Sequence, residues 1–227
     1  MKPALILMLM RRYQKNNPQQ FLVVRAKFLQ VARVALMMVA ALVMALMTRA
    51  QEKTLSYTVR KNGNKIGNMY VKEVRDGSTI YLKLQSDIKT SFILTVSAKG
   101  IEEAKYDSGV MVYSSVYQNV NGAEKINKQI SYVNNAYIIN NKGKEERLDN
   151  IKIYYNLVCI YSHEPARASL IFSDKYQKFL RIEKIEDHHY RIEFPDDSSN
   201  DYWFESGVCH KIKSVHQFYT AIMELKQ

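Results

Sequence analysis

The segment LSYTVRKNGNKIGNMYVKEV, residues 55–74, contains the clearest strand-turn-strand pattern in the chain. Apolar and polar residues alternate from Leu55 to Val59, as on a β-strand with one buried face. Asn62-Gly63-Asn64 then supplies residues that tolerate the positive φ of a tight hairpin turn, and residues 66–74 form the returning strand. The segment therefore predicts an antiparallel hairpin.

Similar patterns follow to the end of the chain. Asp76-Gly77, Asn121-Gly122 and Glu205-Ser206-Gly207 are turn signals of the same kind. Strands are predicted over residues 79–89, 91–98, 110–120, 125–133, 136–139, 180–185, 189–194, 202–204 and 208–215. Residues 140–147 are predicted as a loop and residues 151–161 as a short helix, whereas residues 218–225 fit a strand or a helix.

These elements predict a mainly β fold. A long meander of strands must protect its edges and cover its second face, so it closes into a barrel, packs as a sandwich or curls around a helix. We expect a single curved antiparallel sheet, a half-barrel or open barrel, with one short helix against it. Its concave face either binds a ligand or is filled by side chains, and the sequence leaves both open.

The first 50 residues differ in composition from the rest of the chain. They hold eight of the 33 basic residues and no acidic residue, and Val34–Met47 is an unbroken apolar run. Its length is typical of a signal-peptide core and is short for a membrane span. We expect a signal peptide over residues 1–50, cut after Ala50; the alternatives are an uncleaved anchor and, because the leader is overlong, a translation start downstream of Met1.

The predicted mature chain, residues 51–227, is expected to be one β-rich exported domain, periplasmic or secreted, that does not span the membrane. Removing the eight leader charges leaves 25 basic residues against 22 acidic ones, a net charge of +3 instead of +11. That small excess gives no reason to expect nucleic-acid binding through counterion release. Two cysteines, Cys159 and Cys209, either form a disulfide outside the cytoplasm or are two buried apolar side chains.

No known catalytic or cofactor motif occurs. The chain lacks a G-x-S-x-G elbow, a P-loop, a G-x-G-x-x-G and a C-x-x-C, and its histidines are not spaced to chelate a metal locally. The adjacent carboxylate pairs Glu102-Glu103, Glu145-Glu146 and Asp196-Asp197 are interpreted as solvated turns or charged runs. We therefore expect no enzyme activity, no metal and no cofactor.

Tyrosine is unusually frequent, with sixteen in the chain. Most fall on predicted strands, where aromatic side chains pack well across a sheet. A groove lined by aromatic residues is the functional alternative to simple core packing. The predicted ligand-binding residues are Tyr113, Tyr117, Tyr190, Phe194 and Tyr202.

Four blocks of sequence carry a family resemblance: residues 62–67, 164–180, 189–196 and 200–209. Together they resemble the exported bacterial proteins of domain-of-unknown-function family 6134 over nearly the whole mature chain. Cys209 falls where that family often has a cysteine, whereas Cys159 does not, which weakens the disulfide interpretation. The resemblance implies no established activity and no catalytic residues.

The function expected from the sequence is that of a non-catalytic cell-envelope protein. It would bind an apolar ligand, a lipid or acyl chain, or an extended peptide on the concave face of its sheet. The alternative is a structural or interaction protein with a filled interior that docks to another envelope protein. A hydrolase comes third, and its only candidate groups are His163, Glu164, His189 and His210.

Overall fold

The computed structural model describes residues 27–39, 50–91, 95–217 and 219–226. The chain divides into two units, residues 1–49 and residues 50–227. In the first unit residues 27–39 are helical and exposed, and the rest of the predicted apolar run, residues 40–47, lies outside the described residues. Within the described part, no helix combines the length and apolar character needed to cross a bilayer.

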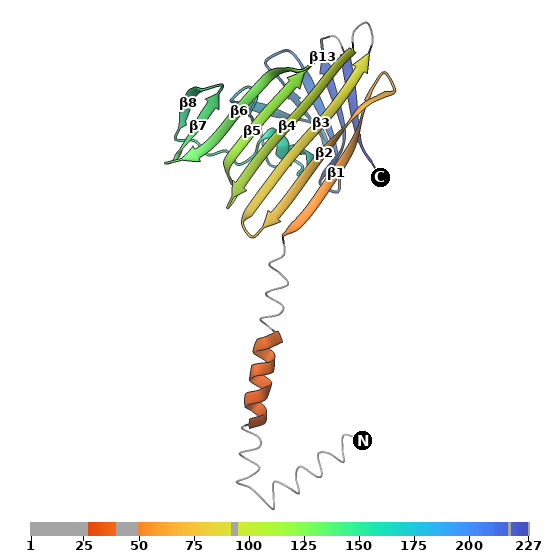
Figure 1. The fold of residues 1–227 in the computed structure, drawn as a ribbon. Helices are drawn as coiled ribbons and strands as arrows, with labels where there is room; N and C mark the ends of the chain where they lie inside the picture. The colour runs from red at the N-terminus through yellow and green to blue at the C-terminus, as the bar shows by residue number, and fades with distance from the viewer. Residues whose placement is uncertain (1–26, 40–49, 92–94, 218, 227) are drawn as a thin grey trace, which may run out of the picture. The chain divides into compact units, whose positions relative to one another are not determined.

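The described residues of the second unit form one antiparallel sheet of fourteen strands that is not closed into a barrel. Figure 1 labels β1 to β8 and β13 along it. The strands are β1 (Gln51–Lys61), β2 (Asn64–Asp76), β3 (Thr79–Ser91), β4 (Thr95–Asp107), β5 (Val110–Val120), β6 (Ala123–Val133), β7 (Ala136–Asn141), β8 (Lys144–Asp149), β9 (Leu170–Ser173), β10 (Lys178–Glu186), β11 (His189–Glu193), β12 (Ser199–Glu205), β13 (Val208–His216) and β14 (Tyr219–Leu225). Their spatial order is β8-β7-β6-β5-β4-β3-β2-β1-β14-β13-β12-β11-β10-β9. This confirms the predicted mainly β, curved antiparallel sheet.

Tight turns give the sheet its up-and-down order. Asn62-Gly63 and Asn121-Gly122 both have two consecutive positive φ angles, 49° and 78° at the first pair and 52° and 81° at the second. Such turns match the right-handed twist of the strands that they join. The first and last strands then pair in the middle of the sheet, with Tyr57 opposite Leu225.

The segment between β8 and β9, residues 150–169, crosses the concave side and fills much of it. Its side chains Ile153, Val158 and Ile160 are almost completely buried. The short 3-10 helix η1 (Leu157–Tyr161) contacts β3 and β4 on one flank and β9 and β13 on the other. Apolar side chains of both flanks pack around this crossover as one continuous core, so the chain itself occupies most of the space inside the curl.

Side-chain contacts bring the two flanks together where the sheet does not close. The turn after β9 approaches β5 and β6: Ser114 Oγ donates to Asp174 Oδ1 at 2.5 Å, and Lys128 Nζ donates to the carbonyl of Lys175 at 2.8 Å. The edge strand β8 exposes charged residues along its length, which discourages pairing with another chain. The edge strand β9 is partly covered, because Phe172 N–H donates to the carbonyl of Tyr155.

Several local predictions need correction. The predicted loop over residues 140–147 is the β7–β8 hairpin, and the predicted helix over residues 151–161 is reduced to η1. Residues 219–225 form strand β14, and β9 was not predicted. Short charged or irregular segments have no clear period of their own, and here pairing with a neighbouring strand decides their conformation.

Candidate functional site

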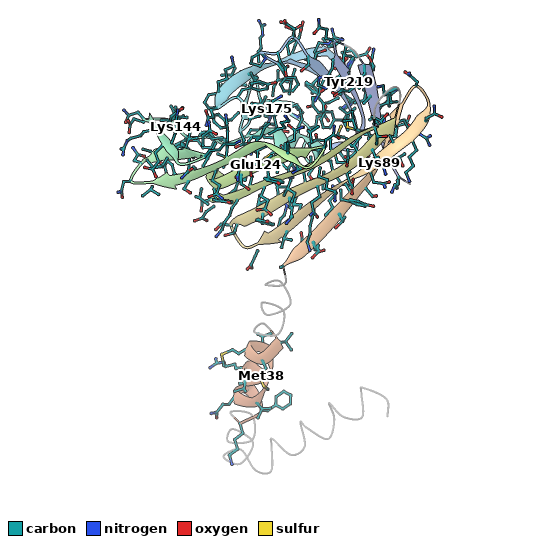
Figure 2. All side chains as sticks on the ribbon, turned by 45° about the horizontal axis from the view of Figure 1, so that its top comes forward. Met38, Lys89, Glu124, Lys144, Lys175 and Tyr219 are labelled. Atoms are coloured by element: carbon teal, nitrogen blue, oxygen red, sulfur yellow. The ribbon has the colours of Figure 1, made fainter. Side chains whose placement is uncertain are left out.

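A polar cavity of about 170 Å³ lies where the crossover, β4, the turn after β9 and strands β12 and β13 meet. Figure 2 labels Lys175 in that turn. The lining combines two carboxylic acids with aromatic and other polar side chains: Glu102, Asp174, Tyr161, Tyr176, Phe194, Tyr202, Lys175, His216, Asn200, Ser173, Ser198, Ser214 and Leu157. Both flanks of the sheet therefore contribute to one site.

Glu102 is the acid that the fold leaves without a partner. On β4 it lies between Leu84 and Val116 of the neighbouring strands, which are buried, so its side chain faces the interior. Burial first, and then the nearby carboxylate of Asp174, raise the pKa of Glu102 to about 7. The charge of Lys175 acts against this shift, but its ammonium is paired with Asp196. Glu102 itself is partly exposed, and none of the hydrogen bonds and ion pairs among the described residues involves its carboxylate.

The structure overturns the interpretation of Glu102-Glu103 as a solvated pair. Both residues are on strand β4, and successive side chains of a strand point to opposite faces. Glu103 faces outward and pairs with Lys83 at 2.8 Å, whereas Glu102 faces the cavity. From the sequence alone, the apolar Ile101 would be expected to face the interior and the charged Glu102 to face solvent. On β4 the two side chains have the opposite orientation.

Asp174 is the second acid of the cavity and is held firmly. The carboxylate accepts hydrogen bonds from Ser114 Oγ at 2.5 Å and from Asn156 Nδ2 at 2.9 Å. Burial nevertheless raises the pKa of Asp174 to about 6, against the effect of these two donors. Near neutral pH the cavity therefore contains two acids that gain or lose protons readily.

A chain of buried hydrogen bonds continues from Asp174 away from the cavity. Tyr106 OH donates to Asn156 Oδ1 at 2.9 Å, and Cys159 Sγ contacts Tyr106 OH at 3.2 Å. Burial raises the pKa of the Cys159 thiol to about 12, so this thiol is not a nucleophile at neutral pH. Cys159 and Cys209 are both free and buried, so the predicted disulfide is not formed and the apolar alternative describes them.

Aromatic rings form the walls of the polar cavity. Tyr161 and Tyr202 meet edge to face with their centroids 6.4 Å apart, and Tyr176 and Phe194 lie 6.0 Å apart. The one ammonium in the lining, Lys175, is paired with Asp196 at 3.2 Å and lies 4.5 Å from the centre of the Tyr176 ring.

Besides the two acids and Lys175, the lining of the cavity includes His216. Burial lowers its pKa, so its imidazole is neutral at pH 7 and adds no positive charge. With both acids ionised, the groups that face the cavity therefore carry a net negative charge.

The five predicted ligand-binding residues divide between the two faces of the sheet. Phe194 and Tyr202 line the polar cavity. Tyr190 is buried in the core, where its hydroxyl donates to Glu164 Oε1 at 2.9 Å. Sequence reasoning missed the two acids, because it had dismissed Glu102 and had assigned Asp174 no role.

Tyr113 and Tyr117 do not face the interior, so the prediction for these two side chains is wrong. A bulge in β5 leaves Val112 without a partner, since Lys105 pairs with Tyr113 and Tyr106 pairs with Met111. The bulge shifts the alternation, so that Met111 and Ser114 are buried. Tyr113 then shares the outer face with the exposed Lys105.

The four candidate catalytic groups do not share a cavity. His163 lines a cavity on the other side of η1 from Asp174, and none of His163, Glu164, His189 and His210 is in the lining of the polar cavity. Glu164 contacts His188 at 3.0 Å, and His189 contacts Asp201 at 3.1 Å while stacking on Trp203. Within the described residues no group of three or more potential metal ligands occurs.

Comparisons with known proteins address the fold and the family. A crystal structure of a β-barrel-like protein of domain of unknown function DUF1849 from Brucella abortus resembles this chain with a TM-score of 0.47 and 10% identity, over 78% of this chain and 95% of that chain. The comparison with curated proteins finds no match. Residues 57–226 match a family described as domain of unknown function DUF6134, which confirms the resemblance seen in the sequence. The chain belongs to the DUF6134 family.

Proposed function

We propose that this domain is a non-catalytic binding protein. It binds a small organic cation, whose positive charge is an ammonium group, in the polar cavity. The observation that carries the proposal is Glu102, an inward-facing acid without a partner among the described residues. Glu102 is partly exposed, and a carboxylate that has lost much of its contact with water is unfavourable unless a charged or hydrogen-bonding group compensates it. A bound ammonium would supply that group.

The composition of the lining supports an organic cation. Two carboxylates attract the charge, and the faces of Tyr161, Tyr176, Phe194 and Tyr202 suit the alkyl groups and the charge of an ammonium ion. Lys175 opposes this charge, but its own ammonium is paired with Asp196. A bare metal ion fits less well, because only two acids face the cavity and metal ions prefer more ligands than that.

The acyl-chain ligand expected from the sequence gains less support from this interior. Ile153, Val158 and Ile160 of the crossover occupy the apolar space of the concave side. The cavity that remains is small, and charged and polar side chains line it together with the aromatic rings. A compact charged ligand satisfies these groups, whereas an acyl chain would leave them without partners.

Calorimetric titration with tetramethylammonium chloride and with choline chloride at pH 8, where both acids are ionised, tests the proposal. Sodium chloride at equal ionic strength is the control for screening. We expect binding by the unaltered protein and a loss of about tenfold or more in Glu102→Gln. Glu103→Gln, the outward neighbour on the same strand, is the matched variant and should bind as the unaltered protein does.

Two results would overturn the proposal. One is the absence of heat with either ammonium salt beyond that of sodium chloride. The other is equal affinity in Glu102→Gln and the unaltered protein, because the cation would then be bound elsewhere.

A second candidate function is that of a structural or interaction protein, and the filled concave side favours it. Such a protein would dock to another envelope component through its outer surface. Crosslinking in cells followed by mass spectrometry would then yield one dominant partner, and the ammonium salts would not bind.

We further propose that the domain works outside the cytoplasm. The support is the basic, acid-free composition of residues 1–50 and the apolar run Val34–Met47. N-terminal sequencing of the natural protein should begin at Gln51. A product that begins near Met1 and fractionates with cytosolic proteins would refute export without affecting the ligand proposal.

A further inference from the structure

A second cavity, of about 260 Å³, lies on the other side of η1 and differs in chemistry from the first. Its floor is apolar and deeply buried, with Leu82, Tyr106 and Cys159 all no more than 5% exposed. Ile80 and Tyr155 continue the lining, and Tyr154, which is 63% exposed, stands at the rim. The cavity therefore offers an apolar interior that opens to solvent beside an aromatic ring.

Two basic side chains from different elements meet at the mouth of this cavity. Arg75 comes from the end of β2 and His163 from the segment after η1, and both line the cavity while remaining partly exposed. The Arg75 guanidinium lies 3.0 Å from His163 Nε2. A guanidinium and an imidazole thus border an opening whose interior is apolar.

A buried acid holds the two basic side chains in place. Glu73 is 3% exposed; its Oε1 pairs with Arg75 Nε, and its Oε2 lies 3.0 Å from His163 Nε2. The same Nε2 also faces the guanidinium of Arg75, so the imidazole lies between the acid and the arginine. Burial acts to raise the pKa of Glu73, but the hydrogen bonds and charges of His163 and Arg75 lower it to about 2.

One guanidinium nitrogen at the mouth is free to meet a ligand. Arg75 Nε pairs with Glu73 and Nη2 contacts His163 Nε2, which leaves Arg75 Nη1 without a hydrogen-bond partner in the described part of the chain. The hydroxyl of Tyr155 donates to the carbonyl of His163 and so fixes the backbone that carries the imidazole beside Arg75. A guanidinium fixed in this way can bind a carboxylate with little loss of side-chain entropy.

We infer that this cavity is a separate binding site for a small monocarboxylate with a compact aromatic or branched apolar body. The carboxylate is bound by the free Nη1 of Arg75 at the mouth, and the apolar body packs on Leu82, Ile80 and the tyrosine rings. The site goes beyond the proposed ammonium function, because the charge it selects has the opposite sign. A long acyl chain is excluded by the size of the cavity.

Titration with sodium benzoate, followed by NMR chemical shifts or calorimetry, tests this inference on the complete domain. Benzamide removes the charge of the probe and acetate removes its apolar body, so both should bind at least about tenfold more weakly than benzoate. Arg75→Gln should weaken benzoate binding by about tenfold or more. Arg60→Gln, which removes an exposed arginine paired with Glu224, should leave it unchanged.

Tyr154→Ala is a second variant that tests the site even if Arg75→Gln fails to fold. Tyr154 lies at the exposed rim, so its removal should not disturb the core. It should weaken benzoate several-fold while the thermal transition stays in place. Equal binding of benzoate and benzamide, no binding of benzoate, or an affinity that neither variant changes would each overturn the inference. Glu102→Gln should not alter benzoate binding, so failure here is distinguishable from failure of the ammonium proposal.

Discussion

Glu73 on β2 and Glu102 on β4 are both inward-facing glutamates on neighbouring parts of one sheet, yet their surroundings have opposite effects. Arg75 and His163 surround Glu73 and hold its pKa at about 2. Glu102 faces a cavity with another acid, Asp174, and its pKa rises to about 7. A buried acid with its partners built in supports the fold, whereas a partly buried acid without such partners weakens it and is explained best by a ligand.

Glu73→Gln gives the largest expected effect on stability. The substitution leaves Arg75 and His163 without their shared carboxylate, and we expect a loss of about 2–3 kcal/mol at pH 7, moderated because both are partly exposed. Urea denaturation measures it. A pKa below the ordinary value stabilises the fold above about pH 4.5 and ceases to do so as the pH falls toward 2, so the variant should also lose less stability in acid than the unaltered protein.

An unchanged urea midpoint in Glu73→Gln at pH 7 would contradict this account of Glu73. It would mean that Arg75 and His163 are as stable in contact with solvent as with the buried acid.

Glu102→Gln is expected to act in the other direction. A pKa raised to about 7 means that the folded state holds its proton while the unfolded state has lost it, so stability falls as the pH rises from about 4.5 to about 7. Removing this acid should raise the free energy of unfolding at pH 8 by about 2 kcal/mol. Asp174, with its pKa near 6, should preserve the lower part of the decline.

The measurement for Glu102→Gln is the free energy of unfolding at several values between pH 4 and pH 8. A profile that stays parallel to that of the unaltered protein over the whole range would show that Glu102 keeps an ordinary pKa in the folded state.

Glu103→Gln should have the smallest effect and completes the comparison. Its carboxylate lies on the outer face and pairs with Lys83, and such partly exposed pairs contribute less than about 1 kcal/mol. We expect a change within about 0.5 kcal/mol at any pH between 5 and 8. A loss of stability as large as that of Glu73→Gln would show that the face of the strand does not decide how much these acids contribute.

The sequence predicted the general fold because its hairpin turns are encoded locally. Asn62-Gly63 and Asn121-Gly122 specify their turns within a few residues, and the alternation on either side specifies which face is buried. The site was harder to predict. The β5 bulge at Val112 reverses the faces of Tyr113 and Tyr117, and no residue type near it marks the bulge.

The polar cavity depends on contacts that only the complete fold provides. Asp174 meets Ser114 from sixty positions earlier in the chain, through the curl of the sheet. Asn156 joins them from the crossover, whose path inside the sheet no local pattern specifies. The raised pKa of Glu102 arises in turn from this enclosure and from Asp174. It could therefore not be inferred from the sequence Glu102-Glu103 alone.

The pairing of β1 with β14 has a consequence for how the domain is assembled. Strand β1 has β2 as one neighbour and β14 as the other. The two halves of the sheet, each built of hairpins, are therefore not joined until residues 219–225 are in place. Until then β1 and β13 each present an open edge that can pair wrongly. A nascent chain therefore stays incomplete along its central seam until residues 219–225 have been synthesised.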